Sequence, residues 1–358
     1  MVWLVGCSSD TPSSPATTTG FPTTQARAAV ATYKELAHRV YRDTAERALL
    51  LQAAVDALVK APGEATHQAA KDAWRAARVP YNQNDAFRFY EGPIDHEPGG
   101  PEASINSWPV DENFLDYTRD DASAGMINHP EAFPVFSPAF IDAQNGVQGE
   151  TEITSGYHAI EFLLWGQDDL TPGTGSGKRP FTDYLEGANG TAKNQGRRGQ
   201  YVQAAAALLA SQLTTVSQAW EPGVDDNYAS TFGVKPDENS ATGDGLKDAV
   251  GNMIRGLGSL AKAELSGERM TVAIKSRDQE DEHSCFSDNT WNDLYGSALG
   301  IQNVWLGQYQ GETLGPGLAE VFRAVDPALA DQVTRRWPQL SGGSRLSRTP
   351  TSRHPSMS

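Results

Sequence analysis

Apolar side chains recur every three or four residues along much of the chain, which is the spacing of a helix with one buried face. Between Gln25 and Lys60 this spacing continues for about ten turns, until Pro62 and Gly63 end it. The predicted helices span residues 25–60, 64–79, 151–165, 197–220, 242–265 and 289–306, with two short ones near Leu318 and Leu329. We expect Pro80 to end the second helix.

Strand patterns are sparse by comparison. Met270 to Ile274 is the only good β-like stretch, and one strand cannot form a sheet, so the pattern predicts an all-α fold. From Tyr81 to Gly149 the periodicity fades and Pro, Gly, Asn and Asp accumulate, which indicates irregular structure with short helices. Ordered loops of this length tend to be functional, and this one is rich in aromatic and carboxylate side chains.

Composition narrows the possible partners. Lys and Arg total 29 against 45 Asp and Glu, for a formal net charge of -16, so the chain repels nucleic acid and attracts cations. The 358 residues exceed the usual size of one hydrophobic core, which favours two compact units. Only two cysteines occur, too few for a disulfide framework or a Cys-rich zinc site.

Cys7 ends the run Leu-Val-Gly-Cys, which is typical of the lipobox of a bacterial lipoprotein signal. Residues 8–24 then form a Ser/Thr/Pro/Gly tether of the kind that follows a lipid anchor. Only Met1 to Trp3 precede the box, so we expect the natural start to lie upstream. Residues 1–24 are therefore predicted to be a truncated lipoprotein signal and a disordered tether, with lipidation at Cys7 and membrane attachment through it. The alternative is a chance LVGC run in a disordered N-terminus.

The most informative segment is GYHAIEFLLWG, residues 156–166, which is apolar on nearly every side and predicts a fully buried helix. His158 and Glu161 lie three residues apart on one face of it, so they can bind one metal ion together. Alternatively His158 donates a hydrogen bond to Glu161, and Arg88 or another base neutralises the carboxylate. Two ligands are few for a metal site. The carboxylate-rich loops offer further oxygens from Asp85, Glu91, Asp111 and Glu112.

A second polar segment, DQEDEHSCFSDNT, spans residues 278–290. Its acidic part is most simply a solvated turn, and Asp288 or Asn289 is a natural N-cap for the helix that follows. His283 and Cys285 form only a lone HxC pair, which is weak support for a soft-metal site. Neither the HExxH motif of zinc peptidases nor the GxSxG motif of serine hydrolases occurs in the chain.

At the GYHAIEFLLWG segment the chain resembles the imelysin family, also called insulin-cleaving membrane protease or iron-regulated protein A-like, whose signature is GxHxxE. Here the signature falls on Gly156, His158 and Glu161. The likeness covers roughly residues 25–340. Other segments that resemble the family are FRFYEGPID, INSWPVDENFLDY, GKRPFTDY, RRGQY and DQEDEHSCFSDNT.

The resemblance implies an all-α fold of two helical-bundle domains that are distant duplicates, here residues 25–190 and 191–340. The Ser/Arg/Pro-rich composition of residues 341–358 predicts a disordered tail. The resemblance also implies a periplasmic or outer-membrane lipoprotein that is regulated by iron. By this resemblance His158 and Glu161 belong to the site, and Asp288 adjoins it. After FSDNT the family commonly has a His where this chain has Trp291, so the C-terminal contribution to the site is altered.

Three functions remain open. The first is an envelope protein that binds iron, another divalent metal or an iron-containing ligand and serves an outer-membrane uptake system. The second is a metallopeptidase, the class to which the family was first assigned, although HxxE supplies at most two of the three protein ligands that a zinc peptidase needs. The third is haem or polysaccharide binding in a cleft between the domains, with Trp108, Tyr90 and Trp165 as apolar surfaces; these aromatics are otherwise simply core.

Overall fold

A computed structural model describes residues 20–147, 149–168 and 175–336, and within them nearly all of the regular secondary structure is helical. The only strands in these ranges are Gln308–Tyr309 (β1) and Glu312–Thr313 (β2), which pair antiparallel in a small hairpin. The prediction of an all-α fold is confirmed. Cys7 and the tail at 341–358 lie outside the described residues.

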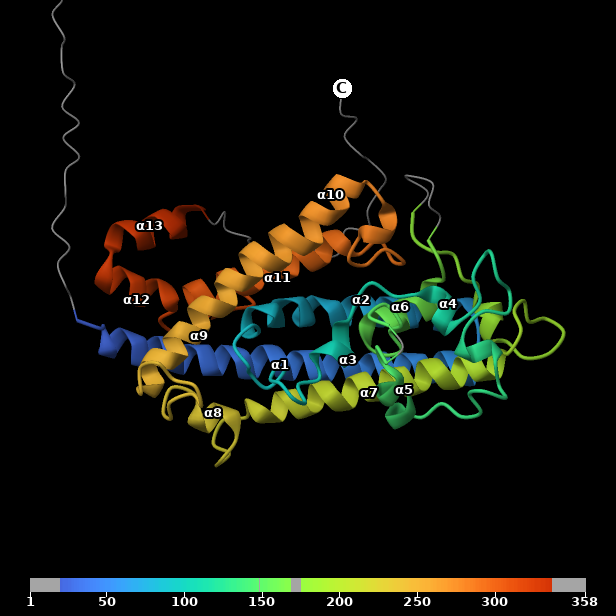
Figure 1. The fold of residues 1–358 in the computed structure, drawn as a ribbon, viewed down its shortest axis with the longest axis horizontal. Helices are drawn as coiled ribbons and strands as arrows, with labels where there is room; N and C mark the ends of the chain where they lie inside the picture. Colours follow the sequence, from blue (N-terminus) through green and yellow to red (C-terminus); the bar gives the residue numbers. More distant parts are fainter. Residues whose placement is uncertain (1–19, 148, 169–174, 337–358) are drawn as a thin grey trace, which may run out of the picture.

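Three long helices form the frame of the molecule. α1 (Thr23–Lys60) packs against α2 (Glu64–Asn84) on one side and against α7 (Gln195–Ala219) on the other, and α1 and α7 run side by side along the long axis (Figure 1). α1 buries a continuous stripe from Ala26 to Leu58 at helical spacing, as its sequence pattern predicts.

α2 continues beyond the point where its sequence predicts an end. Pro80 lies inside the helix, which runs on to Asn84. A proline removes one backbone hydrogen bond, and buried side-chain contacts beyond it offset that loss. Asn84 donates to Thr44 at 2.9 Å, and Gln83 accepts from Asn303 at 2.9 Å. The expected break at Pro80 was wrong because these tertiary contacts cannot be read from local sequence.

A second rod follows α7 and lies diagonally across the frame (Figure 1). It consists of α9 (Gly245–Ser259), the wider π-helical segment η4 (Leu260–Val272) and α10 (Ala273–Ser276). The β-like stretch from Met270 to Ile274 is helical here, so that interpretation was wrong. Arg269 fixes this segment to the core through a 2.9 Å ion pair with Asp85, and no described strand lies beside it.

α11 (Thr290–Leu306) returns from the rod and packs closely on α2. Two glycines one helical turn apart allow this approach. A Cβ at Gly296 would lie 2.7 Å from Cβ of Asn82, and one at Gly300 would lie 2.5 Å from the backbone oxygen of Gln83. The close packing brings the N-terminal half of α11 against the C-terminal half of α2, where the candidate site lies.

Short helices occupy the loops and the C-terminal part. They are η1 (Asp85–Phe87), α3 (Glu102–Asn106), α4 (Glu112–Leu115), η2 (Met126–Asn128), α5 (Pro138–Gln144), η3 (Phe181–Tyr184), α8 (Tyr228–Thr231), η5 (Gln279–Asp281), α12 (Leu318–Val325) and α13 (Pro327–Arg336). Residues 85–147 thus have the short helices and irregular loops expected of the region from Tyr81 to Gly149, whereas Tyr81 to Asn84 complete α2.

The buried apolar residues form one cluster that extends from Ala26 on α1 to Val321 on α12. α7 falls in the second half of the chain but packs along α1 in the first half. The division into duplicated domains at residues 190 and 191 therefore stays a prediction. No described helix combines the length and the apolar character needed to cross a membrane.

Candidate functional site

The candidate site is built on α6 (Gly156–Trp165), a helix whose ten residues are all buried among α2, α3 and α7. We expected this helix to begin near Thr151, but it begins at Gly156. Gly156 has a φ of 82°, and a Cβ there would lie 2.3 Å from the backbone oxygen of Ile105. The glycine of the GxHxxE signature is thus required for the tight contact that places α6 against α3.

His158 and Glu161 contact each other directly on α6. Nδ1 of His158 lies 2.9 Å from Oε2 of Glu161, and both side chains are fully buried. The other carboxyl oxygen, Oε1, accepts two hydrogen bonds from Ser287, one from its backbone N–H at 2.9 Å and one from its hydroxyl at 2.6 Å. Ser287 lies 126 residues away in the chain, so the loop before α11 closes over the pair.

The same loop brings a second imidazole to the site. The ring of His283 lies edge to face with that of His158, with centroids 4.8 Å apart. Nδ1 of His283 lies 2.9 Å from Oδ2 of Asp293 on α11. The site therefore contains two adjacent pairs of one imidazole and one carboxyl group.

Asp293 is fully buried and is the most heavily hydrogen-bonded carboxylate of the site. Arg78 on α2 holds it with Nη2 3.0 Å from Oδ2, and the guanidinium lies against the rings of Trp74, Tyr81 and Tyr157. The further donors to Asp293 are Asn82, His283, Ser284 and Asn289. Asn289 occupies the N-cap position of α11, but its side chain binds Asp293 instead of capping the helix.

Burial sets the protonation of these groups. It raises the pKa of Glu161 to about 8, although the hydrogen bonds from Ser287 act in the opposite direction. It lowers the pKa of His158 well below its usual value and that of His283 to about 3. Burial also opposes ionisation of Asp293, but Arg78 and His283 hold the pKa of that carboxyl well below its usual range. Near neutral pH, Asp293 is ionised, both imidazoles are neutral and Glu161 holds a proton.

Other predicted site residues lie in a neighbouring ion-pair network. Asp85 is buried and pairs with Arg269 at 2.9 Å and with Arg88 at 3.3 Å, and Arg88 also pairs with Glu102 at 2.8 Å. Arg88 thus neutralises Asp85 and Glu102, and neither of its ion pairs is with Glu161. The network meets the site at Ser297, whose hydroxyl lies 2.7 Å from Asp85 and 3.0 Å from the backbone oxygen of Asp293.

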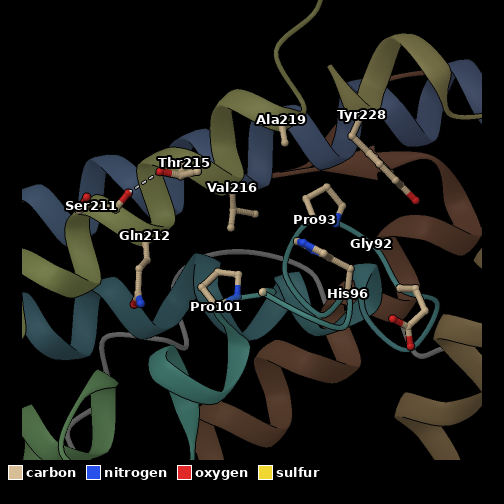
Figure 2. Close-up of a pocket in the computed structure, with 12 residues that line it drawn as sticks. Gly92, Pro93, His96, Pro101, Ser211, Gln212, Thr215, Val216, Ala219 and Tyr228 are labelled. Carbon is tan, nitrogen blue, oxygen red and sulfur yellow. Dashed lines mark hydrogen bonds between the residues drawn. The ribbon is translucent and has the colours of Figure 1, made fainter. Parts of the chain in front are cut away.

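The remaining predicted residues are more dispersed. Asp111 caps α4 by accepting from the N–H of Asn113 at 3.0 Å. Asp288 lies beside the site with a φ of 55° and a pKa raised by partial burial. Glu91 lines a surface cavity of about 670 Å³ between the 91–101 loop and α7 (Figure 2). None of the other site side chains described above lines this cavity.

The aromatic residues divide between core and site. Tyr90 and Trp165 are buried in the apolar core, whereas Trp108 is partly buried with its ring 6.2 Å from that of His283. Cys285 is a buried free thiol. Trp291, at the position where the resemblance leads us to expect a His, is 75% exposed.

Arg78 and Asp293 are the central residues that sequence reasoning missed. Arg78 follows Trp74 by four residues and precedes Tyr81 by three, so it falls within the buried stripe of α2. A charged residue at such a position requires a buried partner, and this was the available signal. Its partner lies 215 residues further along the chain, which no local pattern reveals.

Taken together, these features define an all-α bundle protein with a buried polar site of imidazole and carboxyl groups. The sequence profile of the imelysin family matches residues 37–340, and the chain belongs to that family. Iron-regulated protein A of Synechococcus elongatus is 22% identical over 297 residues, which are 83% of this chain and 68% of that protein.

Two solved structures are also similar. One is of an iron-regulated protein A precursor from Parabacteroides distasonis ATCC 8503, with a TM-score of 0.64 and 20% identity over 88% of this chain and 83% of that one. The other is of an imelysin-like protein from Psychrobacter arcticum 273-4, with a TM-score of 0.45 and 16% identity over 88% of this chain and 94% of that one. The first likeness supports the helical fold.

Proposed function

We propose that this protein binds a metal ion in the polar site around His158 and Glu161, with iron as the first candidate, and that it serves metal uptake at the cell envelope. The observation that supports this most is Nε2 of His158, which is buried and has no hydrogen-bond partner among the described residues. A buried polar atom without a partner is costly, and an imidazole nitrogen is a common ligand of iron, copper and zinc. The residues present therefore fit a metal ion.

Iron is favoured by the relatives. Those from S. elongatus and P. distasonis are described as iron-regulated proteins. Peptide hydrolysis has less support. Within the described ranges, no three His, Cys, Asp or Glu side chains are placed to hold one metal ion together, and a zinc peptidase uses three protein ligands. Binding without hydrolysis is the function that this donor set supports best.

His158→Gln tests the proposed site. We expect the variant to lose more than about 100-fold in affinity for Fe²⁺, beyond the 10- to 100-fold that removal of an outer-shell partner typically costs. Anaerobic calorimetry and metal analysis of the purified protein give the affinity and the stoichiometry. His96→Gln is the matched control, because His96 is exposed and lines the separate surface cavity. Equal Fe²⁺ affinity in the wild type and in His158→Gln contradicts the proposal.

The envelope location is a separate part of the proposal and rests on Cys7. Protein expressed with a complete upstream signal should carry lipid on Cys7 and partition into detergent, because two or three acyl chains give stable membrane attachment. Cys7→Ser should release it with unchanged helix content and Fe²⁺ affinity. Mass spectrometry of the membrane fraction checks the modification, and an unmodified Cys7 there excludes the lipid anchor.

A further inference from the structure

The two imidazoles of the site are held in the same way. In each, Nδ1 faces a buried carboxyl group at 2.9 Å, Glu161 for His158 and Asp293 for His283. A carboxylate hydrogen-bonded to one ring nitrogen is the usual outer-shell arrangement of a metal-binding histidine, in which the opposite nitrogen binds the metal. Both carboxyl groups are on the Nδ1 side, so both Nε2 atoms are on the side away from the carboxyl groups. Because protonated Glu161 donates to Nδ1 of His158, Nε2 of that ring carries a hydrogen in the metal-free protein, and metal binding there releases one proton from the His158 and Glu161 pair.

The hydrogen bonds determine the tautomer of His283. Asp293 is an acceptor because it binds the guanidinium of Arg78 at 3.0 Å, so Nδ1 of His283 must carry the hydrogen that it shares with Asp293. In a neutral ring, Nε2 then has a free lone pair. The two polar contacts that the structure gives this ring, with Asp293 at 2.9 Å and with Arg78 at 3.5 Å, both involve Nδ1 and not Nε2. Nε2 of His283 can therefore bind a metal ion without first losing a proton.

Glu161, in contrast, has little capacity left to bind an ion. Oε2 lies against Nδ1 of His158, and Oε1 accepts both hydrogen bonds from Ser287. Binding a metal through this carboxyl group would break at least one of these buried bonds. As folded, Glu161 is placed to orient His158.

We propose that His158 and His283 bind the metal ion together through their Nε2 atoms, and that Glu161 and Asp293 are positioning residues that hold the two rings. This inference rests on the metal binding proposed above and assigns its ligand atoms. The two rings are adjacent, with centroids 4.8 Å apart. No three His, Cys, Asp or Glu side chains among the described residues are placed to hold one metal ion, so the protein supplies two ligands in this proposal. The remaining coordination positions belong to water or to a small chelator that arrives with the ion.

The donor set selects the class of ion. Two neutral nitrogens suit Fe²⁺, Cu²⁺, Co²⁺ or Zn²⁺ and do not suit Ca²⁺ or Mg²⁺, which prefer oxygen. A cavity of about 480 Å³ between α2 and α11 reaches this part of the core. It is lined by Arg78, Asn82 and Asn289, which all donate to Asp293. Asp293 does not itself line the cavity, so these three side chains lie between the cavity and the carboxylate that holds His283.

Pulsed electron paramagnetic resonance of the full chain loaded with one equivalent of Cu²⁺ tests the ligand atoms. We expect the wild type to show the remote nitrogens of two imidazoles and His283→Gln to show one. His283→Gln should also lose more than about 100-fold in Fe²⁺ affinity, whereas Glu161→Gln should lose about 10- to 100-fold. Ca²⁺ and Mg²⁺ should not compete. His96→Gln is the matched control, because it makes the same substitution at an exposed histidine outside the site.

The possible outcomes separate this inference from the proposed function. If the wild type binds none of these ions, both fail. If His158→Gln abolishes binding while His283→Gln binds as tightly as His96→Gln, or if the wild type shows one imidazole, the shared site is overturned and metal binding stands. If Glu161→Gln loses as much as His158→Gln, Glu161 is a ligand and its positioning role is overturned.

A measurement on the wild type alone covers the case in which His283→Gln does not fold. Nitrogen-15 NMR of histidine-labelled, metal-free protein should find His283 with its proton on Nδ1. Addition of Zn²⁺ should then shift the Nε2 resonances of both His158 and His283. A His283 that carries its proton on Nε2, or whose resonances do not respond to Zn²⁺, overturns the inference.

Discussion

Arg78→Met should destabilise the protein by about 3–5 kcal/mol, which is the usual cost of removing one partner from a buried ion pair. The substitution keeps the apolar stem of the side chain and leaves the Asp293 carboxylate buried without its cation. The pair is 1% and 0% exposed, with Nη2 of Arg78 3.0 Å from Oδ2 of Asp293. Urea denaturation followed by circular dichroism gives the free energy of unfolding.

Arg75→Met is the control, one turn earlier on the same helix. Arg75 pairs with Asp72 at 3.6 Å, and the two side chains are 38% and 62% exposed, so the loss of this pair should cost no more than about 1 kcal/mol. Combining Arg78→Met with Asp293→Asn removes both buried charges and should recover part of the lost stability. A loss below about 1 kcal/mol for Arg78→Met alone would show that the remaining donors suffice for Asp293.

Hydrophobic periodicity predicted the helices well where one face of each is buried by neighbouring helices. α1, α7 and α11 begin and end within two residues of the expected positions. The pattern failed where a single residue suggested a boundary that tertiary contacts override. Pro80 suggests an end for α2, but the buried residues beyond it keep the helix intact.

The opposite error occurred at the start of α6. The apolar pattern suggested a start near Thr151, but the backbone contact between Gly156 and Ile105 delays it to Gly156. Met270 to Ile274 gives a third case, because β-branched residues in isolation suggest a strand whereas the chain continues the preceding helix. In each case a contact distant in sequence decided the local structure.

For the site, sequence reasoning predicted that His158 and Glu161 share one face of a buried helix, because spacing within a helix is a local property. It could not predict Ser287, which supplies both hydrogen bonds to Oε1 of Glu161 from 126 residues away. Asp288 was proposed from the same segment, but its neighbour Ser287 makes the contact. A sequence motif gives only the spacing of residues along the chain, whereas the hydrogen bonds from Ser287 to Glu161 depend on how two distant segments pack together.

Comparison of the wild type with Glu161→Gln should show how strongly the buried carboxyl group makes the stability of the protein depend on pH. Folded Glu161 keeps its proton up to about pH 8, whereas in the unfolded chain it loses that proton near the usual pKa of 4.5. Between these two values unfolding releases a proton, so wild-type stability falls as the pH rises, by at most about 1.4 kcal/mol per pH unit. The effect is complete above pH 8 and absent below about 4.5. Glutamine resembles the protonated acid and has no such dependence.

The comparison is made on metal-free protein in chelator, by urea denaturation from pH 4 to 9. We expect the two proteins to be similarly stable near pH 4.5 and the variant to be more stable by several kcal/mol at pH 8.5. The lowered pKa of His158 gives a dependence of opposite sign, but both proteins contain His158, so its contribution largely cancels in the difference. A stability difference between the two proteins that stays constant from pH 5 to 8 would mean that His158 and Glu161 together bind no more protons in the folded protein than in the unfolded chain. Glu161 would then be ionised at neutral pH, and burial would not control its charge.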